Sequence, residues 1–92
     1  MDDTLLSRIR LAVVAALLAN EWMSFGALVQ AADTTGGNLG AHLAKLVDAN
    51  YVEEEKLFVG RRPQSRYRLT PYGRSAFLNH VKHLQSLAQG VS

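Results

Sequence analysis

The sequence contains no cysteine, which excludes disulfide bonds, thiolate metal sites and a cysteine nucleophile. It also lacks a long apolar run: the longest unbroken one, Leu11 to Ala19, has nine residues, whereas a helix needs about 20 to span a bilayer. The acidic start, Met-Asp-Asp-Thr, lacks the basic region of a secretory signal. These absences predict a cytoplasmic protein without membrane association.

Patterns typical of an enzyme are missing too. The sequence has no paired acid and base, no nucleophile motif and no phosphate-binding glycine loop, since Gly36-Gly37 follows no strand and lacks a lysine. His80 and His83 are three residues apart, but no carboxylate or third ligand accompanies them, which favours surface or interface histidines over a metal site. We predict no enzymatic activity, no metal and no cofactor.

Acidic residues are absent from residues 56–92, and this makes the charge distribution uneven. Residues 1–55 carry three basic and eight acidic side chains, a net charge of −5, whereas residues 56–92 carry seven basic ones, a net charge of +7. A basic half confined to one segment is typical of a protein with a polyanionic partner. Charge alone would suit DNA, RNA or an anionic membrane.

The length of 92 residues predicts a single domain, 1–92, which would bury roughly 60–65% of its unfolded surface if alone. A first helix is predicted from after Thr4 to about Asn20, because this segment lacks glycine and proline and is rich in helix formers. Its second half is apolar all round and must be covered on every side. A partner subunit would supply that cover; the alternative is that its alanines tolerate water.

Capping residues define two further helices. Ser24 is a good N-cap for a helix over 25–32. Thr35 caps a helix over 36–49, which Asn50 would end in the left-handed conformation. One face of this second helix carries a predicted buried stripe of Leu39, Leu43, Leu46 and Val47. Its opposite face carries the small and polar residues Gly37, Asn38, Ala41, His42 and Lys45.

Extended segments are predicted over 21–23, 51–59 and 66–69. The connection over 60–65 contains glycine and proline and is too long for a two-residue turn. Thr70 then caps a last helix over 71–89, with proline at its first position. This helix carries an apolar stripe of Phe77, Val81, Leu84 and Ala88, with Leu87 beside it.

The helix over 36–49 and the basic hairpin tip together predict a DNA-binding surface. Asn38 suits the N6 and N7 atoms of adenine, and Lys45 can reach guanine or a phosphate. An arginine at the tip can enter a narrow minor groove, while Arg68 contacts either a phosphate or the glutamates at 53–55. The predicted DNA-contacting residues are Thr35, Gly37, Asn38, Ala41, His42, Lys45, Arg61, Arg62, Gln64, Ser65 and Arg66.

With these segments in place, the sequence resembles the small winged-helix transcriptional regulators related to the MarR and ArsR types. The resemblance covers about residues 5–88. The matching motifs are S-F-x-x-L from Ser24, T-x-G-N-L-x-x-H-L-x-x-L from Thr35, Y-V at Tyr51, F-V-G-R-x-P from Phe58 and Y-R-L-T-x-x-G-R from Tyr67.

The resemblance implies a mainly α fold with a small β-hairpin wing (α+β), the winged helix-turn-helix, in the order helix, short strand, helix, helix, strand, wing, strand, helix. It also implies a homodimer joined by the first and last helices, with recognition helix 36–49 in the major groove and basic wing 59–66 on the minor groove or backbone. The expected function is a sequence-specific regulator of double-stranded DNA, a repressor at a pseudo-palindromic operator, with an unknown effector. The alternative is a winged-helix module that binds an acidic protein surface. The residues expected at the dimer interface are Leu5, Ile9, Val13, Phe77, Val81, Leu84, Leu87 and Ala88.

Overall fold

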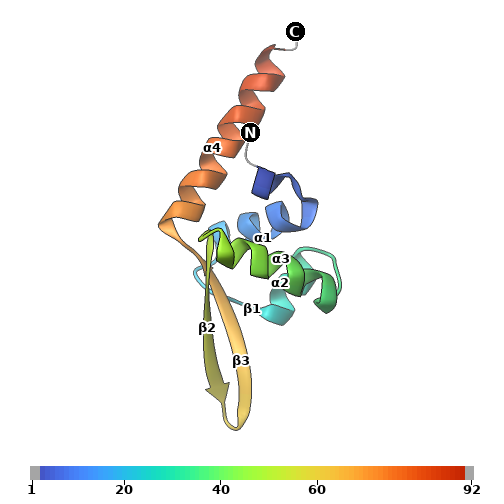
Figure 1. Cartoon of the computed structure of the whole chain (residues 1–92), viewed down its shortest axis with the longest axis vertical. Helices are drawn as coiled ribbons and strands as arrows, with labels where there is room; N and C mark the ends of the chain where they lie inside the picture. The colour runs from blue at the N-terminus through green and yellow to red at the C-terminus, as the bar shows by residue number, and fades with distance from the viewer. Residues whose placement is uncertain (1–2, 91–92) are drawn as a thin grey trace.

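The structure, a computed structural model, describes residues 3–90 (Figure 1). Its strands form one antiparallel sheet in the order β1-β3-β2. The predicted fold class, mainly α with a β-hairpin wing, is confirmed, and so is the order of the predicted elements. The elements are η1 (Asp3–Leu6), α1 (Arg8–Ala19), β1 (Met23–Ser24), α2 (Phe25–Ala31), α3 (Gly36–Asp48), β2 (Val52–Val59), β3 (Arg62–Leu69) and α4 (Pro71–Gly90).

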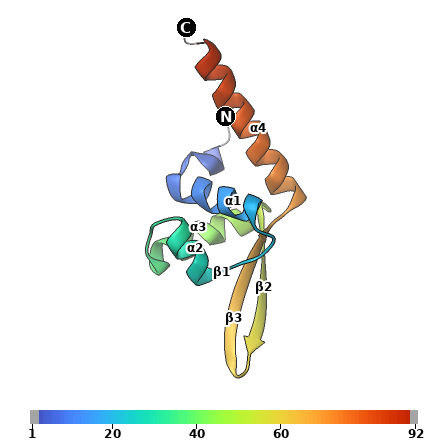
Figure 2. The same cartoon turned by 180° about the vertical axis from the view of Figure 1, so that it is seen from behind.

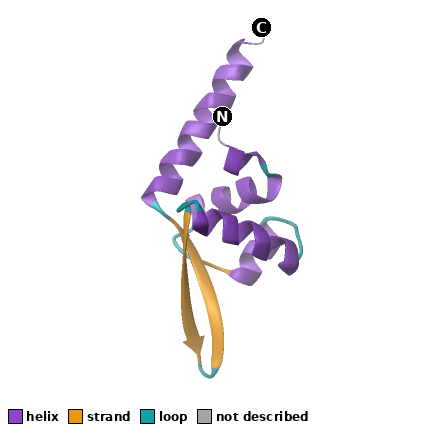
Figure 3. Cartoon of the chain, in the orientation of Figure 1, coloured by secondary structure: helices purple, strands orange, loops and turns teal. Residues whose placement is uncertain are grey.

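The molecule is elongated, with extents of 57 by 25 by 21 Å. Helices α1, α2 and α3 form a body from which α4 and the β2–β3 hairpin extend in opposite directions (Figure 1). In the view from behind, α1 lies across the body, where it packs against α2, α3, β3 and α4 (Figure 2). The far half of the hairpin has no helix beside it (Figure 3). The hairpin tip and the far half of α4 are therefore free to contact other molecules.

The helix ends follow local capping chemistry. The hydroxyls of Ser24 and Thr35 accept hydrogen bonds from backbone N–H groups three residues on, and Asn50 has a φ of 64°. These three predictions are confirmed. The start of the first helix is corrected: the α-helix begins after its N-cap Ser7 instead of after Thr4, because the chain first makes a 3-10 turn over Asp3–Leu6.

The core lies where α1, α2, α3 and the base of the sheet meet. Leu39, Leu43 and Leu46 are buried as predicted, but Val47 is 38% exposed. Val47 lies at the edge of the stripe, because one helical step of 100° from Leu46 turns it away from the core. The remaining buried apolar residues are Leu5, Val13, Val14, Leu17, Leu28, Ala32, Tyr51, Val52 and Tyr67. Within residues 3–90, no helix has the length and apolarity needed to cross a bilayer.

The hairpin turn is shorter than the sequence predicted. Val59 pairs with Arg62, so the turn consists of two residues, and Gly60 occupies its first central position with a φ of +65°. Strand β3 therefore begins at Arg62 instead of Arg66. The proline in 60–65 suggested a loop, but Pro63 pairs with Phe58 on a stretch of β3 that β1 does not reach, where a missing N–H leaves no gap in the ladder.

The start of α4 is joined tightly to the base of the hairpin. The Thr70 hydroxyl donates to the carbonyl oxygen of Asn50 at 2.7 Å and accepts from the N–H of Gly73 at 2.8 Å. This confirms Thr70 as the N-cap. Gly73 packs so closely against Tyr51 that a Cβ there would overlap the Tyr51 carbonyl oxygen. The direction in which α4 leaves the body is fixed by this junction.

Candidate nucleic-acid interface

Helix α3 presents one face to solvent, opposite its three buried leucines. The centre of that face consists of small side chains, and Lys45 and Asp48 lie toward its C-terminal end. Asn38 is exposed at its edge. Ala44 is not among the predicted DNA-contacting residues, although it follows Ala41 by three residues and therefore shares its face. The exposed small residues at the centre of this face are Gly37, Ala41 and Ala44.

His42 is less available than predicted, because α1 holds it. The Arg10 guanidinium lies 3.1 Å from Nδ1 of His42, and Arg10 also donates to the Thr4 carbonyl oxygen at 2.6 Å. Desolvation lowers the pKa of His42, and the charges of Arg10 and Lys45 lower it further. A guanidinium is a donor only, so it favours the tautomer with a free Nδ1 lone pair and Nε2–H as the donor.

The wing tip (residues 56–65) carries positive charge without internal compensation. Arg61, Arg62 and Gln64 are exposed, and Ser65 is half-buried. Among the described residues, neither Arg61 nor Arg62 makes an ion pair. Lys56 adds a third cation, and the segment contains no acidic residue. The tip therefore offers cations that an anion from another molecule can pair with.

The wing root (residues 52–55 and 66–69) is arranged differently, because each of its three glutamates faces a donor on β3. Arg66 pairs with Glu55 at 2.7 Å, and Arg68 pairs with Glu53 at 2.7 Å. Between them, the Tyr67 hydroxyl donates to Glu54 at 2.7 Å. The interpretation of Arg68 as a partner of the glutamates is confirmed, and Arg66, predicted to contact DNA, is engaged in the same way.

Trp22 covers the root arginines from the segment before β1. The guanidinium carbon of Arg66 lies 4.0 Å from the centroid of the Trp22 ring, and that of Arg68 lies 4.8 Å from it. Nothing in the sequence pattern pairs Trp22 with residues more than 40 positions later. Burial, together with the hydrogen bond to Glu54, raises the pKa of Tyr67 to about 12.

Two adjoining hollows lie between the helices and the wing. Their volumes are about 380 and 500 Å³, and both have Phe25 and Tyr67 in their walls. Asp48 and Glu54 line the one beside α3. Carboxylates there repel phosphates, so a polyanion is disfavoured at the root and favoured at the cationic wing tip.

The residues predicted for the dimer interface divide into two groups. Leu5 and Val13 are 1% and 0% exposed, because they fill the core of the protomer, and their placement in an interface is corrected. Leu84 and Leu87 are 42% and 48% exposed on the projecting part of α4. The half-buried residues are Ile9, Phe77 and Val81, and Ala88 is exposed.

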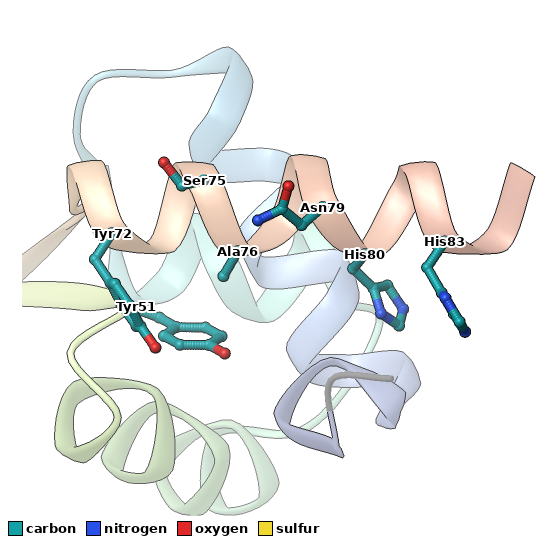
Figure 4. Close-up of a pocket in the computed structure, with 7 residues that line it drawn as sticks. All are labelled: Tyr51, Tyr72, Ser75, Ala76, Asn79, His80 and His83. Carbon is teal, nitrogen blue, oxygen red and sulfur yellow. The ribbon is translucent and has the colours of Figure 1, made fainter. Parts of the chain in front are cut away.

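A separate hollow of about 370 Å³ lies between Tyr51 and the first half of α4 (Figure 4). The rings of Tyr51 and Tyr72 meet edge to face there, 5.4 Å apart. His80 was expected at the surface or an interface but is 4% exposed, and its Nδ1 has no hydrogen-bond partner among the described residues. His83 is exposed. No three potential metal-ligating side chains (His, Cys, Asp, Glu) cluster within residues 3–90.

An exposed helix that follows another helix after a short turn, beside a hairpin with a basic tip, defines a winged helix-turn-helix protein. Residues 9–88 match the family model described as the winged helix DNA-binding domain. The chain belongs to this family.

The chain is similar to several known proteins, and the two with solved structures described below are named as transcriptional regulators or their homologues. The transcriptional regulator homologue from Pyrococcus horikoshii OT3 is 24% identical with a TM-score of 0.87, over 97% of this chain and 88% of that one. A MarR-family transcriptional regulator from Silicibacter pomeroyi is 26% identical with a TM-score of 0.75, over 97% of this chain and 62% of that one. The uncharacterized protein MJ0432 from Methanocaldococcus jannaschii is 31% identical, over 92% of each chain. The resemblance to MarR-type winged-helix regulators is confirmed.

Proposed function

We propose that this protein is a homodimeric, sequence-specific regulator that binds double-stranded DNA and acts as a repressor. Each protomer would place α3 in the major groove and the wing on the adjacent minor groove or backbone. The observation that carries the proposal is the uncompensated charge of Arg61 and Arg62 on the hairpin beside the exposed face of α3. Repression requires only that the bound dimer occupies an operator.

The N-terminal half of α3 supports insertion into a groove. Its exposed face carries small residues, so the helix backbone can approach base edges closely. Asn38 at the edge of that face supplies the hydrogen-bonding groups for adenine, and Lys45, in the last turn of the helix, can reach guanine or a phosphate. The N–H groups of Gly36 and Gly37 have no intrahelical acceptor and can bind a phosphate, whereas the N–H of Asn38 donates to the Thr35 hydroxyl.

The dimer is supported by the far half of α4. Leu84 and Leu87 are 42% and 48% exposed, and they belong to the second half of a helix that projects beyond the body (Figure 1). A twofold dimer presents two α3 helices, and its half-sites would lie one helical turn, about 34–36 Å, apart. The operator would therefore be pseudo-palindromic.

DNA binding is tested by fluorescence anisotropy with random duplex DNA at several salt concentrations. Binding is expected to weaken steeply with salt, with a log–log slope of about −0.9 for each phosphate contacted. The control for the loss of a tip arginine is Arg74→Ala, which removes one positive charge from an exposed position on α4, away from the tip. Absence of binding even at low salt would contradict the proposal and favour the protein-interaction module.

Base reading and dimerisation have separate tests. Asn38→Ala should weaken binding to a selected site by about 1–3 kcal/mol and leave binding to random DNA unchanged. Leu84→Glu should produce monomers in sedimentation velocity, whereas Ser86→Glu, on the opposite side of the same helix, should not. Dimers that survive Leu84→Glu would remove this stripe from the interface.

A further inference from the structure

The wing tip carries apolar surface as well as charge. Phe58 is 74% exposed and Val59 54% exposed. Phe58 lies directly opposite Pro63 on the paired strand, and Pro63 is exposed too. No ribbon of a described helix runs alongside the end of the hairpin (Figure 3), and α2 approaches this part only across the hollow that Phe25 and Pro63 both line. A ring this exposed buries little of its surface among the described residues and is available for a contact with another molecule.

The strand register shows which face carries this apolar pair. Side chains alternate along a strand, so Phe58 and Pro63 share a face with Glu54 and Tyr67 four residues nearer the root. Tyr67 is buried on that face, and Pro63 lines the same hollow as Phe25 of α2. The apolar pair therefore continues the helix-facing side of the sheet, and Val59 lies on the other side.

The surroundings of the pair indicate a nucleic acid rather than an acidic protein surface. Arg61 and Arg62 follow Phe58 at the turn, and Lys56 precedes it on the same face. Proteins that bind the minor groove combine cations for the phosphates with Phe or Pro side chains that insert between base steps and kink the duplex. Phe58 lies four residues, about 13 Å of strand, from Glu54. The minor groove is only about 7.5 Å deep, so Phe58 can enter it while the Glu54 carboxylate stays outside.

We propose that Phe58, supported by Pro63, is a wedge that enters the minor groove, partly unstacks one base step and bends the bound DNA. This inference rests on the proposed function, because it requires the wing to reach duplex DNA. The base step that receives the ring would be a flexible pyrimidine–purine step, TA or CA/TG, since these kink most easily. Specificity then arises at a position where the protein makes no hydrogen bond to a base.

The test uses Phe58→Ala, with Val59→Ala as the matched control that removes apolar surface from the other face. A duplex selected from random DNA by the wild-type protein carries a fluorophore at each end, and 2-aminopurine replaces adenine at successive positions. Wild type and Val59→Ala should shorten the end-to-end distance and raise 2-aminopurine emission at one step. Phe58→Ala should abolish both signals and weaken binding about tenfold without changing the salt slope.

The outcomes separate the wedge from the function beneath it. Wild-type protein that binds with a steep salt dependence but leaves the duplex straight overturns the wedge and leaves DNA binding intact. Bending retained in Phe58→Ala, or lost equally in Val59→Ala, also overturns it. If wild type binds no duplex, both proposals fail. Thermal melting of each variant checks folding, and a change in sedimentation confined to Phe58→Ala would assign the ring to a contact between copies of the chain.

Discussion

The root and the tip of one hairpin use the same amino acid in two ways. At the root, Arg66 and Arg68 are paired with Glu55 and Glu53 and stacked on Trp22. At the tip, Arg61 and Arg62 are exposed and make no ion pair with any described residue. An arginine is therefore paired within the fold at the root, whereas at the tip it is available to bind a phosphate.

This difference shows that a count of arginines overstates the surface available to DNA. Exposed ion pairs contribute about 0–1 kcal/mol each, so the root pairs do little for global stability. Their effect is to hold the guanidinium groups of Arg66 and Arg68 against β2 and Trp22, at the base of the wing. The tip can then be placed on DNA without first being ordered, and this lowers the entropic cost of binding.

The largest expected effect concerns the junction between the base of the hairpin and α4, from which the wing root extends. Gly73→Ala places a Cβ onto the Tyr51 carbonyl oxygen, where backbone has to move. We expect the free energy of unfolding to fall by about 3 kcal/mol in urea denaturation, at the upper end of the usual cost of overpacking. Gly40→Ala is the control, because its Cβ meets open space and should stabilise α3 by about 1 kcal/mol. Equal stability of the two variants would show that the backbone around Tyr51 and Gly73 can move at little cost.

The next effect compares arginines directly. The double change Arg61→Ala with Arg62→Ala should reduce the magnitude of the log–log salt slope by about 1.8, or about 0.9 for each lost phosphate contact. The matched change, Glu53→Gln with Arg68→Gln, removes a root pair at constant net charge and should leave the slope as it is. A reduced slope for the root variant would contradict the difference between root and tip arginines, since it would show that Arg68 also contacts a phosphate.

A smaller effect is expected when a root arginine loses its carboxylate partner and becomes available to DNA, as the tip arginines are. Glu55→Gln removes the partner of Arg66 and one negative charge beside the wing. DNA affinity is expected to rise a few-fold, with the slope steeper by up to about 0.9, because Arg66 becomes available to a phosphate. Glu21→Gln, an exposed glutamate before β1, serves as the charge-matched control. Unchanged affinity would mean that Trp22 alone keeps Arg66 from the DNA.

The last effect concerns the pH dependence of stability. Because the pKa of Tyr67 is raised to about 12 in the folded state, from an ordinary value near 10, the native hydroxyl keeps its proton longer than the unfolded one. The contribution of Tyr67 is fully present below pH 10 and is lost as the pH rises toward 12. Wild type should be about 1–2 kcal/mol more stable than Tyr67→Phe at pH 8, and this advantage should vanish near pH 12. A constant difference across that range would contradict the hydrogen bond to Glu54.

Local features were predicted well where a few neighbouring residues suffice. Ser24, Thr35, Asn50 and Thr70 each act on backbone groups within four residues, so their roles as caps follow from short sequence patterns. The hairpin turn was misjudged because Pro63 normally marks a loop. Whether a proline fits in a strand depends on the strand beside it, and β1 ends before reaching Pro63.

Roles that depend on distant partners could not be predicted in the same way. Leu5 and Val13 have the apolar character that an interface also requires, and only packing shows that they fill the protomer's core. The pairing of His42 with Arg10 spans 32 positions, and the stacking of Arg66 on Trp22 spans more than 40. Neither leaves a periodic signal in the sequence.

The amino-acid order accounts for the element types, the helix caps, the basic second half and the family, because each of these depends on composition or on residues close together in the chain. Only the tertiary structure decides which side chains are available for contacts with other molecules. Whether an arginine is paired or available, whether a leucine lies in the core or on a surface, and which face carries Phe58 all depend on strand register and helix packing. These bring together residues far apart in the chain, and a side chain already paired within the fold is not available to DNA.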